Sequence, residues 1–177
     1  MMFDVGALGA SAVSACCLLG TPRPLRVWIS SSLMVLAMLG CVLASAAPGL
    51  GLVSIVLSLA SAGFALQRRE GRLTPMSLHR ALGGVAMAAL VAMSLGMAGA
   101  HVSAAPAHAH GVPIAVIAFA LVAGFLAYSA WLLVAMARAG ASARAAAARP
   151  RGARARGLLE LGEVAGMTVG VLLMCAM

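Results

Sequence analysis

Long apolar runs separated by short breaks constrain this chain more than any other feature, because roughly 20 consecutive apolar residues let an α-helix cross a bilayer. The breaks carry residues that end helices, among them Pro48 with Gly49 and the stretch from Pro106 to Pro113. The sequence therefore predicts an all-α, integral membrane bundle of about six transmembrane helices, in a single domain over 1–177. The expected spans are about 3–20, 27–46, 50–67, 78–100, 112–137 and 158–177.

The composition indicates that lipid is the main solvent of the folded chain. Of the 177 residues, 63% are hydrophobic and 9% are charged, whereas about a quarter of the residues of a soluble domain are charged. The mean hydropathy is +1.07. No stretch is both long and polar enough to form a separate soluble domain.

The 12 basic side chains are all Arg, and they dominate a net charge of +8. In the six-helix arrangement every Arg lies in or beside the first, third or fifth connection, on one side of the membrane. Cytoplasmic loops are enriched in Arg and Lys, so this side is predicted to be cytoplasmic, with both termini extracytoplasmic and the chain in the cell (plasma) membrane. A different number of helices would scatter the Arg over both sides. They are Arg23, Arg26, Arg68, Arg69, Arg72, Arg80, Arg138, Arg144, Arg149, Arg151, Arg154 and Arg156.

The segment over 138–157 is rich in Ala and Arg and is predicted to form a basic cytoplasmic loop, either disordered or as a helix at the membrane interface. Each Arg near an anionic leaflet contributes about 1 kcal/mol of attraction. The lipid bilayer, and its anionic lipids at this loop, are therefore the expected partners. A basic chain can also bind nucleic acid, but charges placed beside membrane spans argue against that partner.

Methionine and histidine gather toward the outer ends of the helices that are expected to run outward. Met93, Met97 and His101 follow one another at steps of four and so share a helical face, and Met34, Met38 and Cys41 form a second stripe. Thioether and imidazole groups together suit copper(I), which makes an outer copper site one prediction. The other interpretation is packing, since Met fills gaps between helices and the chain has no compact CxxC motif. The candidate ligands are Met93, Met97, His101, His108, His110, Met174 and Met177.

Glu163 is expected to lie inside the membrane, about 9 Å along its helix from Gly157 at 1.5 Å per residue. His79 and Arg80 open another helix at a similar depth, and a pair of Glu163 with either of them would satisfy its charge. As a functional site, Glu163 and His79 would relay protons. As a structural feature, the pair would clamp two helices near the interface, where a charge costs least.

A ridge of small residues is predicted to bring helix backbones close together in lipid. Gly162, Gly166 and Gly170 recur every four residues on the last span. The ridge is expected to pack against helices of this bundle, and the alternative is an interface with another membrane protein.

Two stretches resemble a family of uncharacterised actinobacterial multi-pass membrane proteins, known only as a domain of unknown function. The resemblance rests on Leu78-His79-Arg80-Ala81-Leu82-Gly83-Gly84 with Met93 and Met97 after it, and on Gly162 to Met167 with Met174 and Met177. It covers about the last three spans and implies a small helical membrane protein without a known activity. His79 matches a His of the family, whereas Glu160 and Glu163 depart from its pattern on the last helix.

An enzyme is not expected, because the sequence has no Gly-rich phosphate loop, GxSxG or HExxH motif. The first functional prediction is a non-enzymatic accessory or assembly protein of the membrane, bound to another membrane protein through its Gly and Ala ridges. The alternatives are a copper-handling membrane protein that uses the outer Met and His side chains, and a small transporter that uses Glu163.

Overall fold

The computed structural model describes Gly9 and residues 25–44, 47, 49–66, 73–100, 114–145 and 151–176. In these ranges the chain forms five α-helices: α2 (Leu25–Leu43), α3 (Gly49–Leu66), α4 (Pro75–Ala100), α5 (Ile114–Ala145) and α6 (Arg151–Cys175). Four of them, α3 to α6, contain stretches long and apolar enough to cross a membrane, and the apolar part of α2 is shorter. The predicted all-helical fold is therefore confirmed for the described residues, and four of its helices could span a membrane. Apart from Gly9, the expected span over 3–20 lies outside the described residues.

The helices extend into the segment for which a basic loop is predicted. Hydropathy places the ends of the two flanking spans near 137 and 158, yet α5 continues to Ala145 and α6 begins at Arg151. Ala and Arg are among the strongest helix formers, so a sequence too polar for the hydrocarbon core still continues a helix beyond it. Most of the segment over 138–157 is thus helical.

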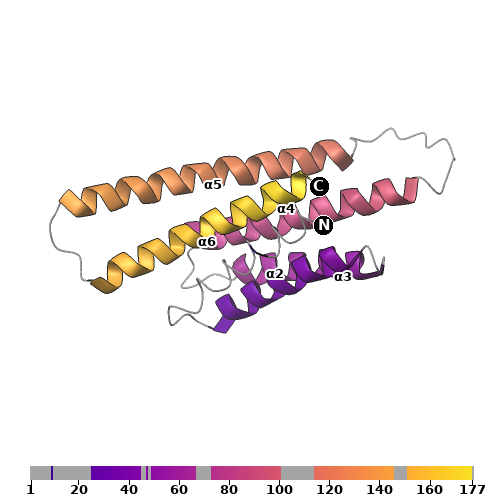
Figure 1. Ribbon diagram of the computed structural model, residues 1–177, viewed down its shortest axis with the longest axis horizontal. Helices are drawn as coiled ribbons and strands as arrows, with labels where there is room; N and C mark the ends of the chain where they lie inside the picture. The colour runs from indigo at the N-terminus through magenta and orange to yellow at the C-terminus, as the bar shows by residue number, and fades with distance from the viewer. Residues whose placement is uncertain are drawn as a thin grey trace.

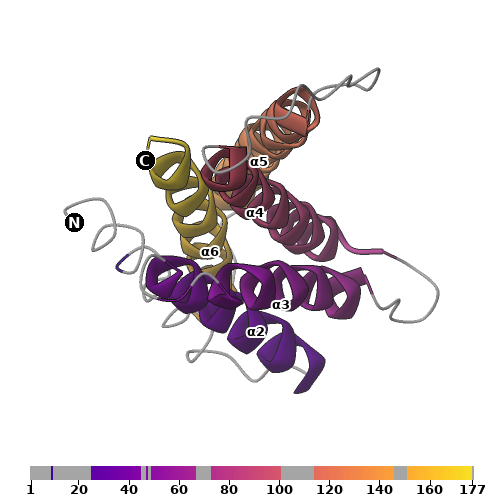
Figure 2. The same cartoon turned by 90° about the vertical axis from the view of Figure 1, so that its right-hand side faces the viewer.

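The bundle is arranged around α4 (Figures 1 and 2). This helix packs against α3, α5 and α6, while α2 packs against α3, and α6 also against α5. Half of the α4 span is buried, compared with 28% of the α3 and α5 spans and 22% of the α6 span. The helix that carries His79 and Arg80 is therefore the most buried of the four candidate spans in the described part of the chain.

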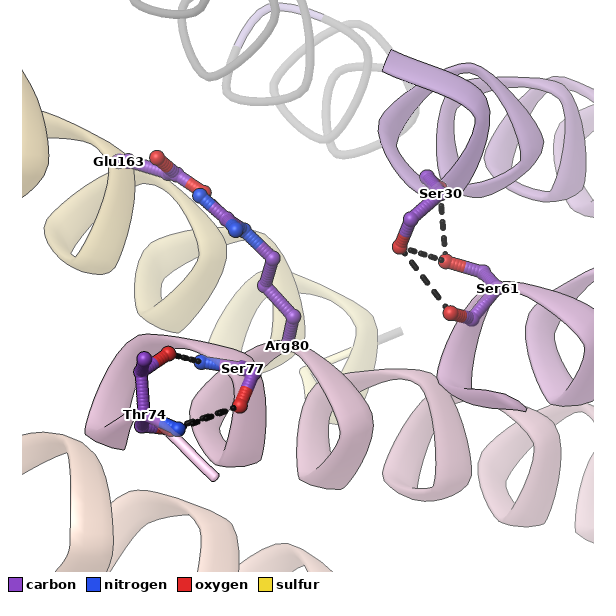
Figure 3. A network of polar contacts seen from close by, with 6 residues as sticks. All are labelled: Ser30, Ser61, Thr74, Ser77, Arg80 and Glu163. Carbon is purple, nitrogen blue, oxygen red and sulfur yellow. Dashed lines mark hydrogen bonds and ion pairs between the residues drawn. The ribbon is translucent and has the colours of Figure 1, made fainter. Parts of the chain in front are cut away.

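Close contacts join α2, α3 and α4. Ser30 of α2 and Ser61 of α3 each donate a hydroxyl hydrogen bond to the other's carbonyl oxygen, at 3.0 and 2.7 Å (Figure 3). At Gly84 of α4, a Cβ atom would stand 2.8 Å from the carbonyl oxygen of Ser58 on α3. Only glycine allows such an approach of two backbones, and close packing of this kind is what holds helices together in lipid.

The exterior of the bundle is more apolar, and its interior more polar, than is usual for a soluble protein. Several buried side chains are polar, including Ser54, Ser58 and Ser129, while Leu52, Val56 and Phe119 are more than half exposed. A core of six buried apolar residues packs at the contact of α2, α4, α5 and α6: Met38, Ala86, Met87, Val122, Phe125 and Val171. Apolar side chains outside and polar side chains inside are expected where lipid surrounds the bundle.

Candidate functional site: an intramembrane pocket beside an ion pair

The first turn of α4 fixes the position of the charged side chains that follow it. The hydroxyl of Thr74 accepts a bond from the Ser77 amide, and the hydroxyl of Ser77 accepts one from the Thr74 amide, both at 3.1 Å (Figure 3). This reciprocal cap satisfies amides that a helix start leaves unpaired, and Pro75 suits the first helical position. The same turn is held to α5, because the Tyr128 hydroxyl donates a hydrogen bond to the Pro75 carbonyl oxygen at 3.1 Å.

Arg80 of α4 and Glu163 of α6 form an ion pair inside the bundle. Figure 3 shows the two side chains extended toward each other, with Arg80 Nε donating to Glu163 Oε1 at 2.5 Å. Only 13% of the Arg80 side chain and 3% of the Glu163 side chain are exposed. Of the two pairings that the sequence allowed for Glu163, the structure brings together the one with Arg80.

His79 lies instead between α4 and α5 and is fully buried. Its ring stacks on Phe125 with the ring centroids 5.1 Å apart, and its Nδ1 lies 3.3 Å from the Ser129 hydroxyl oxygen. That hydroxyl donates to the Phe125 carbonyl oxygen at 2.7 Å, so it can only accept from Nδ1–H. Nε2 of His79 has no hydrogen-bond partner among the described residues.

Beside the ion pair, α2, α3, α4 and α6 line a partly open pocket of about 50 Å³. Its polar lining comes from Ser30 and Ser31 of α2, Ser61 of α3, Arg80 of α4 and Glu163 of α6. One water position needs roughly 10–15 Å³ in such a measure, so the pocket has room for a few waters or a small ion. An open space of this size, walled by a charged pair between membrane helices, can hold a polar or charged guest.

The lining also contains four thioethers, those of Met34 and Met38 on α2, Met87 on α4 and Met167 on α6. None of the four is among the ligands predicted for the outer copper site. The signal that could have found them is helical spacing: Met34 and Met38 are four residues apart, as are Glu163 and Met167. Ser30, Ser61 and Ser129 carried no comparable signal, because Ser is common in membrane helices.

Most of the predicted outer cluster lies outside the part of the chain that the structure describes. Met93 is half-buried on α4, and Met174 packs against the apolar core. Met97 lies in α4 with its side chain outside the described part, and His101, His108, His110 and Met177 fall outside the described residues. Within the described ranges, no group of three or more His, Cys, Asp or Glu side chains could hold a metal ion.

The glycine ridge of α6 faces the inside of the bundle. Gly166 and Gly170 line the pocket, and a Cβ atom on Gly170 would be 3.7 Å from the terminal methyl carbon of Met38. Gly162 is half-buried. Two of the three glycines thus leave space for the pocket.

Comparison with protein-family models, curated proteins and solved structures finds no match for this chain.

Proposed function

We propose that this protein is a small, non-enzymatic membrane transporter that binds a solute or ion in the pocket between α2, α4 and α6. The observation that carries the proposal is the Arg80–Glu163 ion pair in the wall of that pocket. Ionisable groups inside membrane bundles are costly and commonly mark the path of a substrate or ion. A pair that served only to clamp α4 to α6 would need no open space beside it.

The pair gives the pocket a means of responding to its guest. Removing one partner of a buried ion pair leaves the other charge uncompensated. A guest that binds Glu163 or Arg80 therefore changes what holds α4 to α6. Glu163 is the proposed coupling group, because its carboxylate can exchange the Arg80 guanidinium for a bound cation or a proton.

The proposed topology has six spans, with both termini outside the cytoplasm, in the plasma membrane. It is supported by the Arg residues, which all fall on one side in that arrangement. Here α2, α4 and α6 run outward from the cytoplasmic side. The ion pair then lies toward the cytoplasmic end of the pocket, and the segments around Met38, Met87 and Gly170 lie deeper in the membrane.

Cysteine labelling tests the transporter and does not require its guest to be identified. In a background with Cys16, Cys17, Cys41 and Cys175 replaced by Ser, Ser31→Cys puts a thiol in the pocket lining. A membrane-impermeant maleimide is then applied to right-side-out and to inverted vesicles. We expect labelling from both sides, and a severalfold change in the ratio of the two rates when Glu163→Gln is added.

The neighbouring residue supplies a matched control, because Ser32 is exposed on the outer face of the bundle. Ser32→Cys should react slowly from either side, since lipid excludes the reagent there. Labelling of Ser31→Cys from one side only, with or without Glu163→Gln, would contradict alternating access.

The accessory or assembly function remains a second candidate, and α5 supplies a surface for it. Ala120, Ala123, Gly124 and Ala127 are all exposed, and nothing lies within 4 Å of a Cβ atom on Gly124. Exposed small residues let a helix of another membrane protein approach closely. A membrane partner that co-purifies with the wild type should be lost in Gly124→Ile and retained in Gly140→Ile, which also has open space around it.

A further inference from the structure

The strongest unexplained feature of the pocket is its set of thioethers. Met34 and Met38 share one face of α2 at helical spacing, while Met87 comes from α4 and Met167 from α6. Met87 is 1% exposed and Met38 8%. Three separate helices thus direct sulfur-containing side chains to a single space of about 50 Å³.

Two glycines show where the ends of these side chains lie. The terminal methyl carbon of Met167 lies 2.8 Å from where a Cβ atom would stand on Gly83 of α4, so Met167 reaches across to α4. Similarly, the methyl carbon of Met38 reaches α6 at Gly170. Gly83 is one helical turn before Met87, and Gly170 is about one turn after Met167. Met167 therefore bridges α6 to α4 and Met38 bridges α2 to α6, while Met87 of α4 lines the same pocket.

Packing alone does not explain this arrangement. Met fills irregular gaps because its side chain is long and flexible, and interiors rarely keep voids larger than a water molecule. Met38 and Met87 belong to the apolar core and Met34 and Met167 pack against it, yet all four also line an open space that this packing leaves unfilled. At Gly83 an added Cβ atom would force the end of Met167 to shift, whereas at Gly170 it would be in ordinary van der Waals contact with the end of Met38.

We propose that this pocket binds a soft monovalent metal ion, copper(I) in the cell, through the thioethers of Met34, Met38, Met87 and Met167. Thioethers select copper(I) over magnesium, calcium and manganese, which require oxygen ligands. The inference rests on the proposed transporter, for which it names the substrate. The proposed metal ligands are different side chains from those of the outer Met and His cluster.

The polar end of the pocket holds one anionic side chain, Glu163, whose charge Arg80 balances. A monovalent cation is costly to move into a membrane interior unless an anion lies close by. Glu163 lines the same pocket and lies one helical turn before Met167. Its pairing with Arg80 keeps the carboxylate compensated while the pocket is without metal, and an arriving cation competes for that carboxylate.

The test is copper binding by the full chain in detergent, with copper kept as copper(I) by ascorbate and a bathocuproine chelator as competitor. We expect about one copper per chain, bound at least tenfold more weakly by Met38→Leu with Met167→Leu. Leu is close to Met in volume, so packing is retained, and circular dichroism verifies the fold. Met93→Leu, on the same bundle outside the pocket lining, should bind like the wild type.

X-ray absorption at the copper edge provides a second readout, and sulfur should dominate the first coordination shell. The inference is overturned if the folded wild type binds no copper(I), or if binding survives Met38→Leu with Met167→Leu. It is also overturned if Met97→Leu with His101→Ala abolishes binding, which would move the metal to the outer cluster.

These failures are distinguishable from failure of the transporter. If Ser31→Cys is labelled from both sides but no copper(I) binds, the transporter stands and its substrate is another solute. If copper(I) binds at the thioethers but labelling occurs from one side only, the pocket is a fixed metal site and the transporter fails.

Discussion

Arg80 and Glu163 stand 83 residues apart in the sequence, yet the Arg80 Nε atom donates a 2.5 Å hydrogen bond to Glu163 Oε1. The contact links α4 to α6 directly across one edge of the pocket. Because both side chains are largely withdrawn from the surface, the contribution of this pair depends on both partners being present.

Replacing one partner of the pair should cost more than replacing both. We expect Glu163→Gln or Arg80→Gln to lower the free energy of unfolding by about 3 kcal/mol, since each leaves a buried charge without compensation. The double variant Arg80→Gln with Glu163→Gln should cost clearly less than the sum of the two. Unfolding in detergent micelles measures all three, and Arg138→Gln, at an exposed position of α5, should be near wild type. Additive losses would show that the pair does not interact.

Gly84 should be intolerant of even one added carbon atom. In Gly84→Ala the new Cβ would meet the Ser58 carbonyl oxygen at 2.8 Å, and a backbone atom cannot rotate away as a side chain can. Overpacking of this kind costs about 1–3 kcal/mol, to be measured as a lower unfolding temperature. Gly124→Ala, with nothing within 4 Å, is the control and should not be destabilised. Equal effects of the two variants would contradict the close approach of α3 and α4.

The reciprocal serine bonds between α2 and α3 should make a small but measurable contribution. Ser61→Ala removes the hydroxyl that donates to the Ser30 carbonyl oxygen, and side-chain hydrogen bonds between membrane helices contribute about 0.6 kcal/mol, reaching about 1.7. Ser32 lies on α2 and is exposed, so Ser32→Ala should change the stability by less than Ser61→Ala. A larger loss in Ser32→Ala than in Ser61→Ala would be incompatible with the contact.

His79 should carry its proton on Nδ1. The Ser129 hydroxyl uses its only proton on the Phe125 carbonyl oxygen, so its oxygen must accept from the imidazole. In a variant with His101, His108 and His110 replaced by Gln, ¹⁵N spectra of the remaining ring should show a protonated Nδ1 and an unprotonated Nε2. Ser129→Ala should reduce that tautomer, and a ring protonated on Nε2 in the parent would disprove the assignment.

The helices were predictable because the thickness of a bilayer fixes how long an apolar run must be. The positions of α3 and α4 accordingly follow the runs near 50–67 and 78–100. The continuation of α5 to Ala145 was not predicted, since hydropathy detects the membrane boundary, whereas Ala and Arg keep a helix intact beyond it.

The site was less accessible to sequence reasoning, because depth along a helix can be counted but rotation about its axis cannot. Counting placed His79, Arg80 and Glu163 at one level, and left open which neighbour Glu163 contacts. The structure turns Arg80 toward α6 and His79 toward Ser129 of α5. For the same reason, the sequence placed Met93 and Met174 together because they lie at a similar depth. In the structure the helices are rotated so that Met38, Met87 and Met167 line the pocket together.

The contact between Gly84 and Ser58 has a mechanical consequence. Because Ser30 of α2 is bonded to Ser61 of α3 and α4 packs closely against the α3 backbone, α2, α3 and α4 should move as one rigid body. The freedom to open or narrow the space they share with α6 then belongs to α6, which is the least buried of the four candidate spans. In any conformational cycle, α6 would be the helix that moves, and the Arg80–Glu163 ion pair would hold it against α4 until the pair breaks.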